Sequence, residues 1–154
     1  MEDKNLKAAK LKTAKYCAYQ ERTQQQLRDK LYDWGLYADD VEEVLSFAIE
    51  EGFINEERFA QAYASGHFNL KKWGKIKIAH ALKQKGLSYY CIEKGLEEIE
   101  AEQYNETILS LLKKKLATLK ETDDFIKKQK AANYLIQKGY ESDLVWKELN
   151  LLFQ

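Results

Sequence analysis

The sequence predicts an all-α protein, a curved and elongated tandem array of three three-helix repeats with about nine helices in all. Three observations lead to this fold class. The 154 residues include no proline, so no residue of the chain forces a helix to break. Leu, Lys, Glu, Gln and Ala are plentiful and β-branched residues are sparse, a composition that favours helices. The third observation is a helix–glycine–helix pattern that occurs three times.

The central copy of this pattern spans residues 78–96. Its first helix carries two apolar residues four apart, which share one face, and Gly86 follows where a helix would end in a left-handed turn. Ser88 can then cap a second helix. The pattern recurs around Gly35 and Gly139, about 50 residues before and after, which leaves room for three helices in each unit. The repeated apolar positions are Leu27, Leu31, Val41 and Leu45; Ile78, Leu82, Ile92 and Leu96; and Ala131, Leu135, Val145 and Leu149.

The repeat divides one all-α domain, residues 16–154, into three units at about residues 16–52, 53–101 and 102–154. Residues 1–15 form a basic N-terminal arm or the start of the first helix, and they contain five lysines. This segment is either a solvated or frayed helix, or a cationic arm that binds a polyanion.

Residues with good capping side chains mark the expected helix starts, because their oxygens can accept from free backbone N–H groups. The expected starts are Thr23, Asp39 or Asp40, Asn55, Ser88, and Asp123 or Asp124. At the opposite helix ends, Gly35, Gly86 and Gly139 are expected in left-handed turns, which a residue without a Cβ atom adopts most easily.

Composition and motifs argue against several functional classes. Positive and negative side chains balance at 25 each, so overall charge favours neither nucleic acid nor membrane as a partner. Cys17 and Cys91 are too few for a disulfide scaffold and favour reduced thiols in the cytoplasm. His67 and His80 lack partners at metal-ligand spacing, and no glycine-rich phosphate loop occurs. We therefore expect a cytoplasmic monomer without signal peptide or membrane span, and no enzyme, cofactor or metal site.

The charges are nevertheless segregated along the chain. Residues 16–65 carry eleven carboxylates against four cationic side chains, whereas residues 59–92 contain no Asp or Glu. This acid-free segment holds six lysines interleaved with aromatic residues. An ordinary solvated helix mixes both signs, because opposite charges four residues apart stabilise it, so the segment indicates an anionic partner. The expected partner-binding residues are Lys71, Lys72, Trp73, Lys75, Lys77, Lys83, Lys85, Arg22 and Arg58. The alternative interpretation places Trp73 in the core, with ordinary solvated lysines around it.

Several short motifs resemble the RecX family of regulatory proteins. The run from Gly52 to Ala60 is similar to that family's Gly-aromatic-aliphatic-Asp/Asn-x-x-Arg-Phe-Ala signature. Three further stretches resemble other family motifs: Trp73-Gly74 with Ile78, Leu82 and Lys85-Gly86-Leu87; Cys17 to Thr23 with Leu27 and Leu31; and Lys138-Gly139-Tyr140. The resemblance covers about residues 16–153 and is carried by the order of these motifs together with the repeat.

The resemblance implies a three-helix-repeat protein that binds the recombinase RecA. Such a protein lodges in the helical groove of the RecA–DNA filament, with single-stranded DNA inside the filament as a second contact. It inhibits filament growth, ATP hydrolysis, strand exchange and coprotease activity, and so acts in homologous recombination, DNA repair and the SOS response. Two other functions stay open: direct nucleic-acid binding through the basic middle repeat, and a helical adaptor for another protein. A groove-reading helix-turn-helix is disfavoured, because the helix after Gly86 carries Glu93, Glu97 and Glu98, which repel phosphate.

Overall fold

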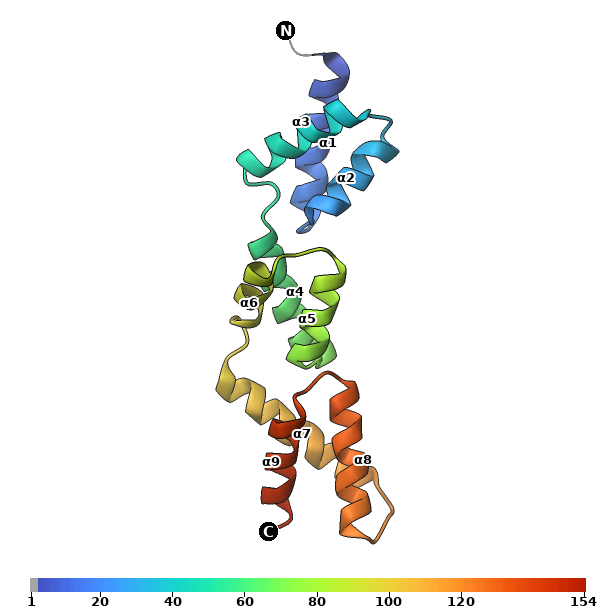
Figure 1. The fold of residues 1–154 in the computed structure, drawn as a ribbon, viewed down its shortest axis with the longest axis vertical. Helices are drawn as coiled ribbons and strands as arrows, with labels where there is room; N and C mark the ends of the chain where they lie inside the picture. The colour runs from blue at the N-terminus through green and yellow to red at the C-terminus, as the bar shows by residue number, and fades with distance from the viewer. Residues whose placement is uncertain (1–2) are drawn as a thin grey trace.

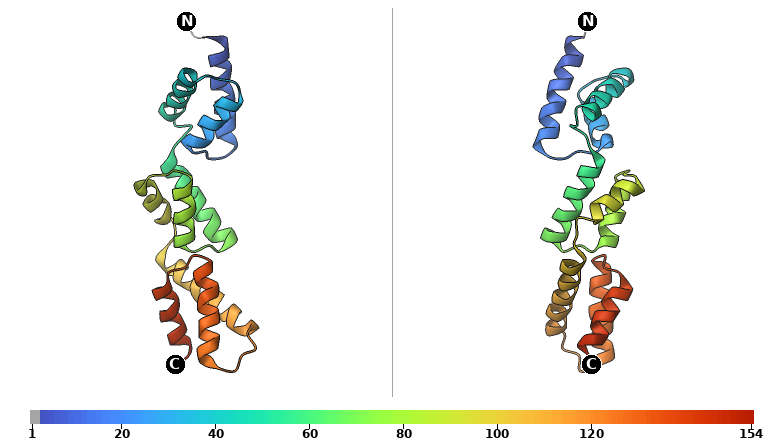
Figure 2. Two further views of the ribbon diagram at one scale, coloured as in Figure 1. Left: turned by 45° about the vertical axis from the view of Figure 1, so that its right-hand side comes forward. Right: turned by 90° about the vertical axis from the view of Figure 1, so that its left-hand side faces the viewer.

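The computed structural model describes residues 3–154, and every regular element within them is an α-helix. These helices form three groups of three, stacked one after another so that α1 and α9 lie at opposite ends (Figure 1). The helices are α1 (Lys4–Tyr19), α2 (Gln24–Asp33) and α3 (Ala38–Glu50); α4 (Glu56–Lys71), α5 (Lys75–Gln84) and α6 (Tyr89–Leu96); and α7 (Ala101–Thr118), α8 (Asp124–Gln137) and α9 (Ser142–Leu152). The molecule is elongated in every view (Figure 2), and the predicted all-α tandem array is confirmed.

Each unit consists of a first helix followed by a helical hairpin, α2–α3, α5–α6 or α8–α9. Gly35, Gly86 and Gly139 form the hairpin turns with φ of +90°, +85° and +98°, in the left-handed region that the repeat predicted. The repeated apolar positions face the interior, as expected for side chains that share one helix face. All are buried except Leu96, which is half-buried and packs against the core.

Side-chain caps begin four of the helices as predicted. Thr23 forms a reciprocal capping box with Gln26 at α2, and Asn55 Oδ1 accepts from the backbone N–H of Arg58 at 2.9 Å. Ser88 caps α6 and Asp123 caps α8 in the same way. The prediction that Asp39 or Asp40 starts α3 is wrong by one or two residues. Helix α3 begins at Ala38 without a side-chain cap, and both aspartates lie in its first turn, where the helix dipole favours negative charge.

Helix α1 is part of the first unit from its first turn onward. Leu6, Ala9 and Thr13 are buried, and α1 packs against α3. Residues 4–15 are therefore a packed helix and not a frayed arm, although four of their five lysines are exposed. Met1 and Glu2, which belong to the same predicted segment, lie outside the described residues.

Among the described residues, the buried apolar side chains form two separate clusters. The smaller one belongs to the first unit and includes Leu27, Val41 and Ile54. The larger one runs without interruption through the second and third units, from Phe59 to Leu149. Each fully buried Leu or Ile stabilises its cluster by roughly 1.5–3 kcal/mol, so the second and third units are stabilised together while the first is stabilised by its own core.

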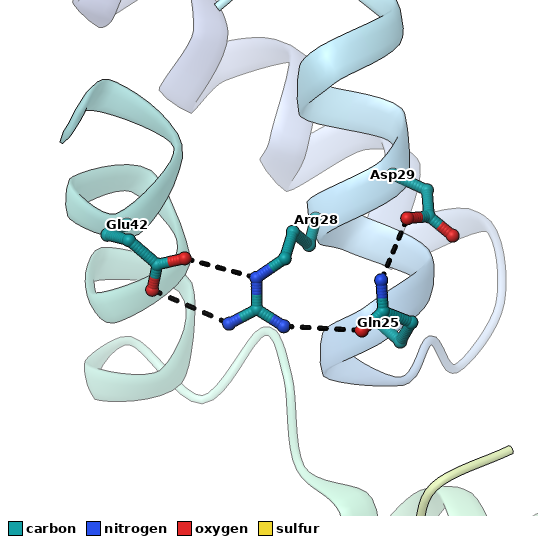
Figure 3. A network of polar contacts seen from close by, with 4 residues as sticks. All are labelled: Gln25, Arg28, Asp29 and Glu42. Atoms are coloured by element: carbon teal, nitrogen blue, oxygen red, sulfur yellow. Dashed lines mark hydrogen bonds and ion pairs between the residues drawn. The ribbon is translucent and has the colours of Figure 1, made fainter. Parts of the chain in front are cut away.

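The first unit is also held by polar contacts across the α2–α3 hairpin (Figure 3). Arg28 donates from Nε and Nη2 to the two carboxylate oxygens of Glu42, at 3.1 and 3.5 Å. Its remaining nitrogen donates to Gln25, which in turn donates to Asp29. These side chains are largely exposed, so the network contributes less than about 1 kcal/mol and mainly fixes the angle between the two helices.

The junction between the first and second units is polar. Arg58 Nε on α4 donates to Glu21 Oε2 at 2.6 Å, and its Nη2 donates to the carbonyl of Gly52 at 3.0 Å. Glu56 accepts from the backbone N–H of Gln24 at 3.0 Å, which places a carboxylate at the start of α2. No apolar cluster of the described residues spans this junction.

The junction between the second and third units is made by the backbone itself. The N–H groups of Gly74 and Ile76 donate to the carbonyls of Lys138 and Gly139, at 2.8 and 2.9 Å. A Cβ atom on Gly74 would lie 2.3 Å from the carbonyl carbon of Gly139, so only glycine permits this approach. The turn before α5 and the α8–α9 turn thus interlock (Figure 1).

Two buried tyrosines complete this second junction. The Tyr104 hydroxyl donates to the carboxylate of Glu141 and accepts from the backbone N–H of Lys75 at 3.0 Å. The Tyr140 hydroxyl donates to the carbonyl of Lys72 at 2.8 Å. Burial raises the pKa of both tyrosines, and the neighbouring Glu141 raises it further. Both hydroxyls therefore remain protonated well beyond the pH at which an exposed tyrosine ionises.

Candidate functional site

The acid-free segment builds a compact cluster of rings and ammonium groups on the second unit. We call it the lysine–aromatic cluster and define it as Tyr63, His67, Trp73, Lys71, Lys77 and Lys85. Successive turns of α4 place Tyr63 under His67 with ring centroids 3.8 Å apart, and His67 lies 4.6 Å from Trp73. Helix α4 ends at Lys71 with Lys72 as its C-cap, and the indole of the following residue, Trp73, lies back against His67.

Three lysines of the cluster stand over these rings. The Nζ atoms of Lys77 and Lys71 lie 4.5 and 5.5 Å from the Trp73 ring centroid, and that of Lys85 lies 5.7 Å from Tyr63. Each such pair contributes about 0.5–1 kcal/mol when solvent-exposed, so it favours the placement of the ammonium group beside the ring. The result is a positively charged surface whose ammonium groups gather around the rings.

Trp73 combines parts of the two interpretations made from the sequence. It is half-buried and packs against the shared core of the second and third units. Its ring nevertheless remains within reach of Lys71 and Lys77. The indole thus packs against the core and also interacts with the two lysines beside it.

The other lysines of the acid-free segment lie elsewhere. Lys75 and Lys72 are at the second junction: Lys75 Nζ lies 4.7 Å from the Tyr104 ring centroid, and the Lys72 carbonyl accepts from Tyr140. Lys72 is also the C-cap of α4, with φ of +59°, and it is the only described residue other than glycine with positive φ. Lys83 is exposed on α5.

The two predicted arginines lie at the first junction, away from the lysine–aromatic cluster. The Arg22 guanidinium carbon stacks 3.8 Å from the Tyr16 ring centroid, and its Nε donates to the Tyr16 carbonyl at 3.1 Å. Arg58 bridges Glu21 and the carbonyl of Gly52. Both guanidinium groups thus have partners within the chain, and a role in partner binding stays a prediction.

The histidines and cysteines make local contacts. The Nδ1 of His67 lies 2.9 Å from the carbonyl of Tyr63, and the Nε2 of His80 lies 3.2 Å from Gln84. Burial raises the pKa of the Cys17 thiol, which makes it less reactive. Across residues 3–154 no three His, Cys, Asp or Glu side chains come together as metal ligands, and none of their helices is long and apolar enough to cross a membrane.

A second lysine-rich surface, on the third unit, was missed by the sequence analysis. Residues 107–120 and 125–140 contain no Asp or Glu and carry four lysines each. The carboxylates between them are confined to residues 121–124, where Asp123 caps α8 and Glu121 pairs with Lys130. Counting carboxylates along each stretch, as was done for residues 59–92, would have found this surface.

Three stacked units of three helices each define a helical repeat protein. Models of the first, second and third three-helix domains of RecX match residues 9–47, 55–96 and 101–149. The chain therefore belongs to the RecX family of regulatory proteins.

Individual relatives agree with this family. Regulatory protein RecX of Clostridium perfringens strain 13 is 34% identical over 124 residues, which cover 79% of this chain and 58% of the relative. Regulatory protein RecX of Clostridioides difficile strain 630 is 26% identical over 155 residues, covering 99% of this chain and 71% of the relative. The crystal structure of RecX from Lactobacillus salivarius shares the fold, with a TM-score of 0.88, 22% identity and 96% coverage of both chains. This chain thus spans less than two thirds of the length of the Clostridium perfringens relative.

Proposed function

We propose that this protein binds RecA–DNA filaments and inhibits their growth, ATP hydrolysis, strand exchange and coprotease activity. The observation that carries the proposal is the match of all three units, in order, to the three helical domains of RecX. The elongated array supports it, because a long surface made of similar units suits the groove of a polymer with regularly spaced subunits. The effect would be exerted by occupancy of the filament and not by catalysis, as a monomer in the cytoplasm.

The lysine–aromatic cluster is the proposed contact with the filament. Lys71, Lys77 and Lys85 are held over rings, so little side-chain freedom is lost when they meet an anionic face. The acidic first unit lies on one side of this cluster along the array (Figure 2). Opposite charges on neighbouring units would fix the direction in which the molecule docks.

Neutralising the cluster tests this proposal. In the triple variant Lys71→Gln, Lys77→Gln and Lys85→Gln, we expect binding to RecA-coated single-stranded DNA to weaken at least tenfold, or about 1.4 kcal/mol. The control variant Lys4→Gln, Lys7→Gln and Lys15→Gln removes the same charge from the exposed face of α1. Fluorescence anisotropy measures affinity, and inhibition of RecA ATP hydrolysis measures function. Wild-type inhibition by the cluster variant would remove the cluster from the interface.

The same titration on bare single-stranded DNA separates this proposal from direct nucleic-acid binding by the middle repeat. A protein that binds bare strands through its lysines loses affinity with salt, with a slope of about 0.7 per phosphate contacted. We expect binding to RecA-coated DNA to be much tighter than binding to bare DNA at the same salt concentration. Equal affinities and equal salt slopes would favour the direct nucleic-acid binder.

A further inference from the structure

The third unit carries a groove that the proposed function does not use. Four adjoining shallow hollows, open to solvent and of 240 to 390 Å³, share lining residues and follow α7 onto α8. We call this the α7–α8 groove. Lysines border it and leucines form part of its floor. The residues that the argument uses are Lys72, Lys114, Lys115, Leu109, Leu111 and Tyr134.

The three lysines that α7 contributes to this groove have no acidic partner one helical turn away. Lys113, Lys114 and Lys115 are consecutive, and no residue three or four positions away on either side is acidic. Lys113 and Lys114 are exposed and form no ion pair in the described part of the chain. Lys113 and Lys114 line one hollow, and Lys114 and Lys115 line another, so a bound anionic group would offset positive charge that no acidic residue one turn away offsets.

Carboxylates limit the length of the groove. Glu106 lines the first two hollows on α7, and residues 121–124 bring three more carboxylates beyond the other end of the groove. The helix between these limits spans about 20 Å. A long polyanion such as a nucleic-acid strand would run past the lysines onto carboxylates at either side. A segment of about six extended residues fits between them.

The leucines in the lining of the groove and the aromatic ring of Tyr134 also favour a polypeptide as the ligand. Leu109 and Leu111 are half-buried and line it, so they offer apolar contact that a sugar-phosphate backbone does not match. Tyr134 is the aromatic residue in the lining, and the Nζ atoms of Lys115 and Lys138 lie 4.7 and 5.6 Å from its ring centroid. The ring therefore already interacts with two ammonium groups, whereas a base-stacking platform needs an open ring face.

We infer that the α7–α8 groove binds a short protein segment that combines carboxylates with apolar side chains. The carboxylates pair with Lys114 and Lys115, with Lys72 available where the groove approaches the second unit, and the apolar side chains cover Leu109 and Leu111. This site is separate from the lysine–aromatic cluster. It does not depend on the proposed function, because the segment would bind whether or not RecA is present.

A labelled peptide of seven alternating Glu and Leu residues tests the inference, with the full chain and fluorescence polarisation as the readout. We expect saturable binding that weakens at least tenfold in Lys114→Gln/Lys115→Gln. Leu109→Ser, which removes only apolar floor, should weaken it about threefold. Lys4→Gln/Lys7→Gln is the matched charge control on α1 and should bind as wild type. Amide chemical shifts should change along α7 and α8 when the peptide is added.

Three outcomes would overturn the inference. The first is the absence of saturable binding up to about 1 mM peptide, and the second is binding that the groove variant leaves unchanged. The third is tighter binding of a seven-nucleotide oligothymidylate that the same groove variant abolishes, which would make the groove a nucleic-acid site. Inhibition of RecA by the groove variants is measured in parallel. Groove variants that lose peptide binding but inhibit RecA normally, and cluster variants that lose inhibition but bind the peptide normally, would show that the two sites act separately. Failure of one proposal is then distinguished from failure of the other.

Discussion

The two junctions of this array join similar units in different ways. Between the first and second units the contacts are polar and made largely by side chains, with Arg58 and Glu21 as the main pair. Between the second and third units, backbone meets backbone at Gly74 and Gly139, and one apolar core continues through both. The repeat that builds each unit therefore does not decide how strongly neighbouring units are coupled. Residues outside the repeated apolar positions decide it.

This difference predicts that the chain behaves as two rigid bodies, the first unit alone and the second and third units together. The first unit has its own core and is attached through residues 51–55 and the Arg58 contacts, so we expect it to change its angle at little cost. The second and third units share a core and should move and unfold as one. The variants below test that division, from the largest expected effect to the smallest.

Gly139→Ala should cause the largest loss of stability. Its Cβ would lie 2.3 Å from Cβ of Lys77 and 2.7 Å from the Lys77 backbone nitrogen, at a position with positive φ. Strain and displacement together should destabilise the second and third units by about 3 kcal/mol or more, measured by chemical denaturation. Gly86→Ala is the control, because the same repeat position there has φ of +85° but nothing within 4 Å. It should cost only about 1 kcal/mol, and equal losses would mean that the interlocked turns do not couple the units.

Alkaline pH should weaken the second and third units selectively. Folding raises the pKa of Tyr104 and Tyr140, so in both cases the native state keeps a proton that the unfolded state loses above about pH 10. Their stabilisation is complete below that pH and falls as pH rises further, by up to about 1.4 kcal/mol per pH unit for each tyrosine. Hydrogen exchange between pH 9 and 11 should show protection falling in α4–α9 before it falls in α1–α3. Replacement of both by Phe should lower stability near neutral pH but remove most of this pH dependence.

Arg58→Gln should loosen the first junction with little effect on global stability. The side chains of Arg58 and Glu21 are 45% and 29% exposed, so their ion pair contributes at most about 1 kcal/mol. We expect the spread of distances between labels on α2 and α5 to widen, as measured by double electron–electron resonance, while labels on α5 and α8 keep theirs. High salt should widen the first distribution in the wild type as well. A narrow distribution in Arg58→Gln would show that the units are coupled by something other than this polar contact.

Lys72→Gly should leave the stability of the protein unchanged or raise it slightly, unlike the preceding variants. Lys72 adopts φ of +59°, which is strained for a residue with a side chain, and its junction contact uses only its carbonyl. Glycine should relieve about 1 kcal/mol of strain, partly offset by greater freedom in the unfolded chain. The melting temperature should therefore stay level or rise slightly, and a clear fall would mean that the lysine side chain itself supports the second junction.

The fold could be predicted from the sequence because its main signals are local. The apolar spacing around Gly35, Gly86 and Gly139 is read within about 20 residues, and caps such as Thr23 act within three. The junctions could not be predicted, because the contact of Gly74 with Gly139 joins residues far apart and depends on the angle between units. Neither composition nor periodicity around Gly74 or Gly139 indicates that the two residues are in contact.

The candidate surfaces were predicted in part. The acid-free segment indicated a basic surface, but its sequence did not show that only some of its lysines gather around Trp73 while Lys72 and Lys75 lie at a junction. Those placements follow from where α4 ends and α5 begins, and boundaries are the least predictable part of a helix. The RecX motifs identified the family correctly because their order along the chain is more specific than any one of them.

The continuous core also bears on how the chain folds as it leaves the ribosome. The first unit has all partners for its core within its own 50 or so residues, so it can fold while later parts are still being made. The middle unit must wait, because the Lys72 carbonyl meets its partner Tyr140 only 68 residues later. Until α8 emerges, one side of the middle unit is open and exposes apolar surface. That interval, and not the finished molecule, is when this protein should be most prone to aggregate and most dependent on chaperones.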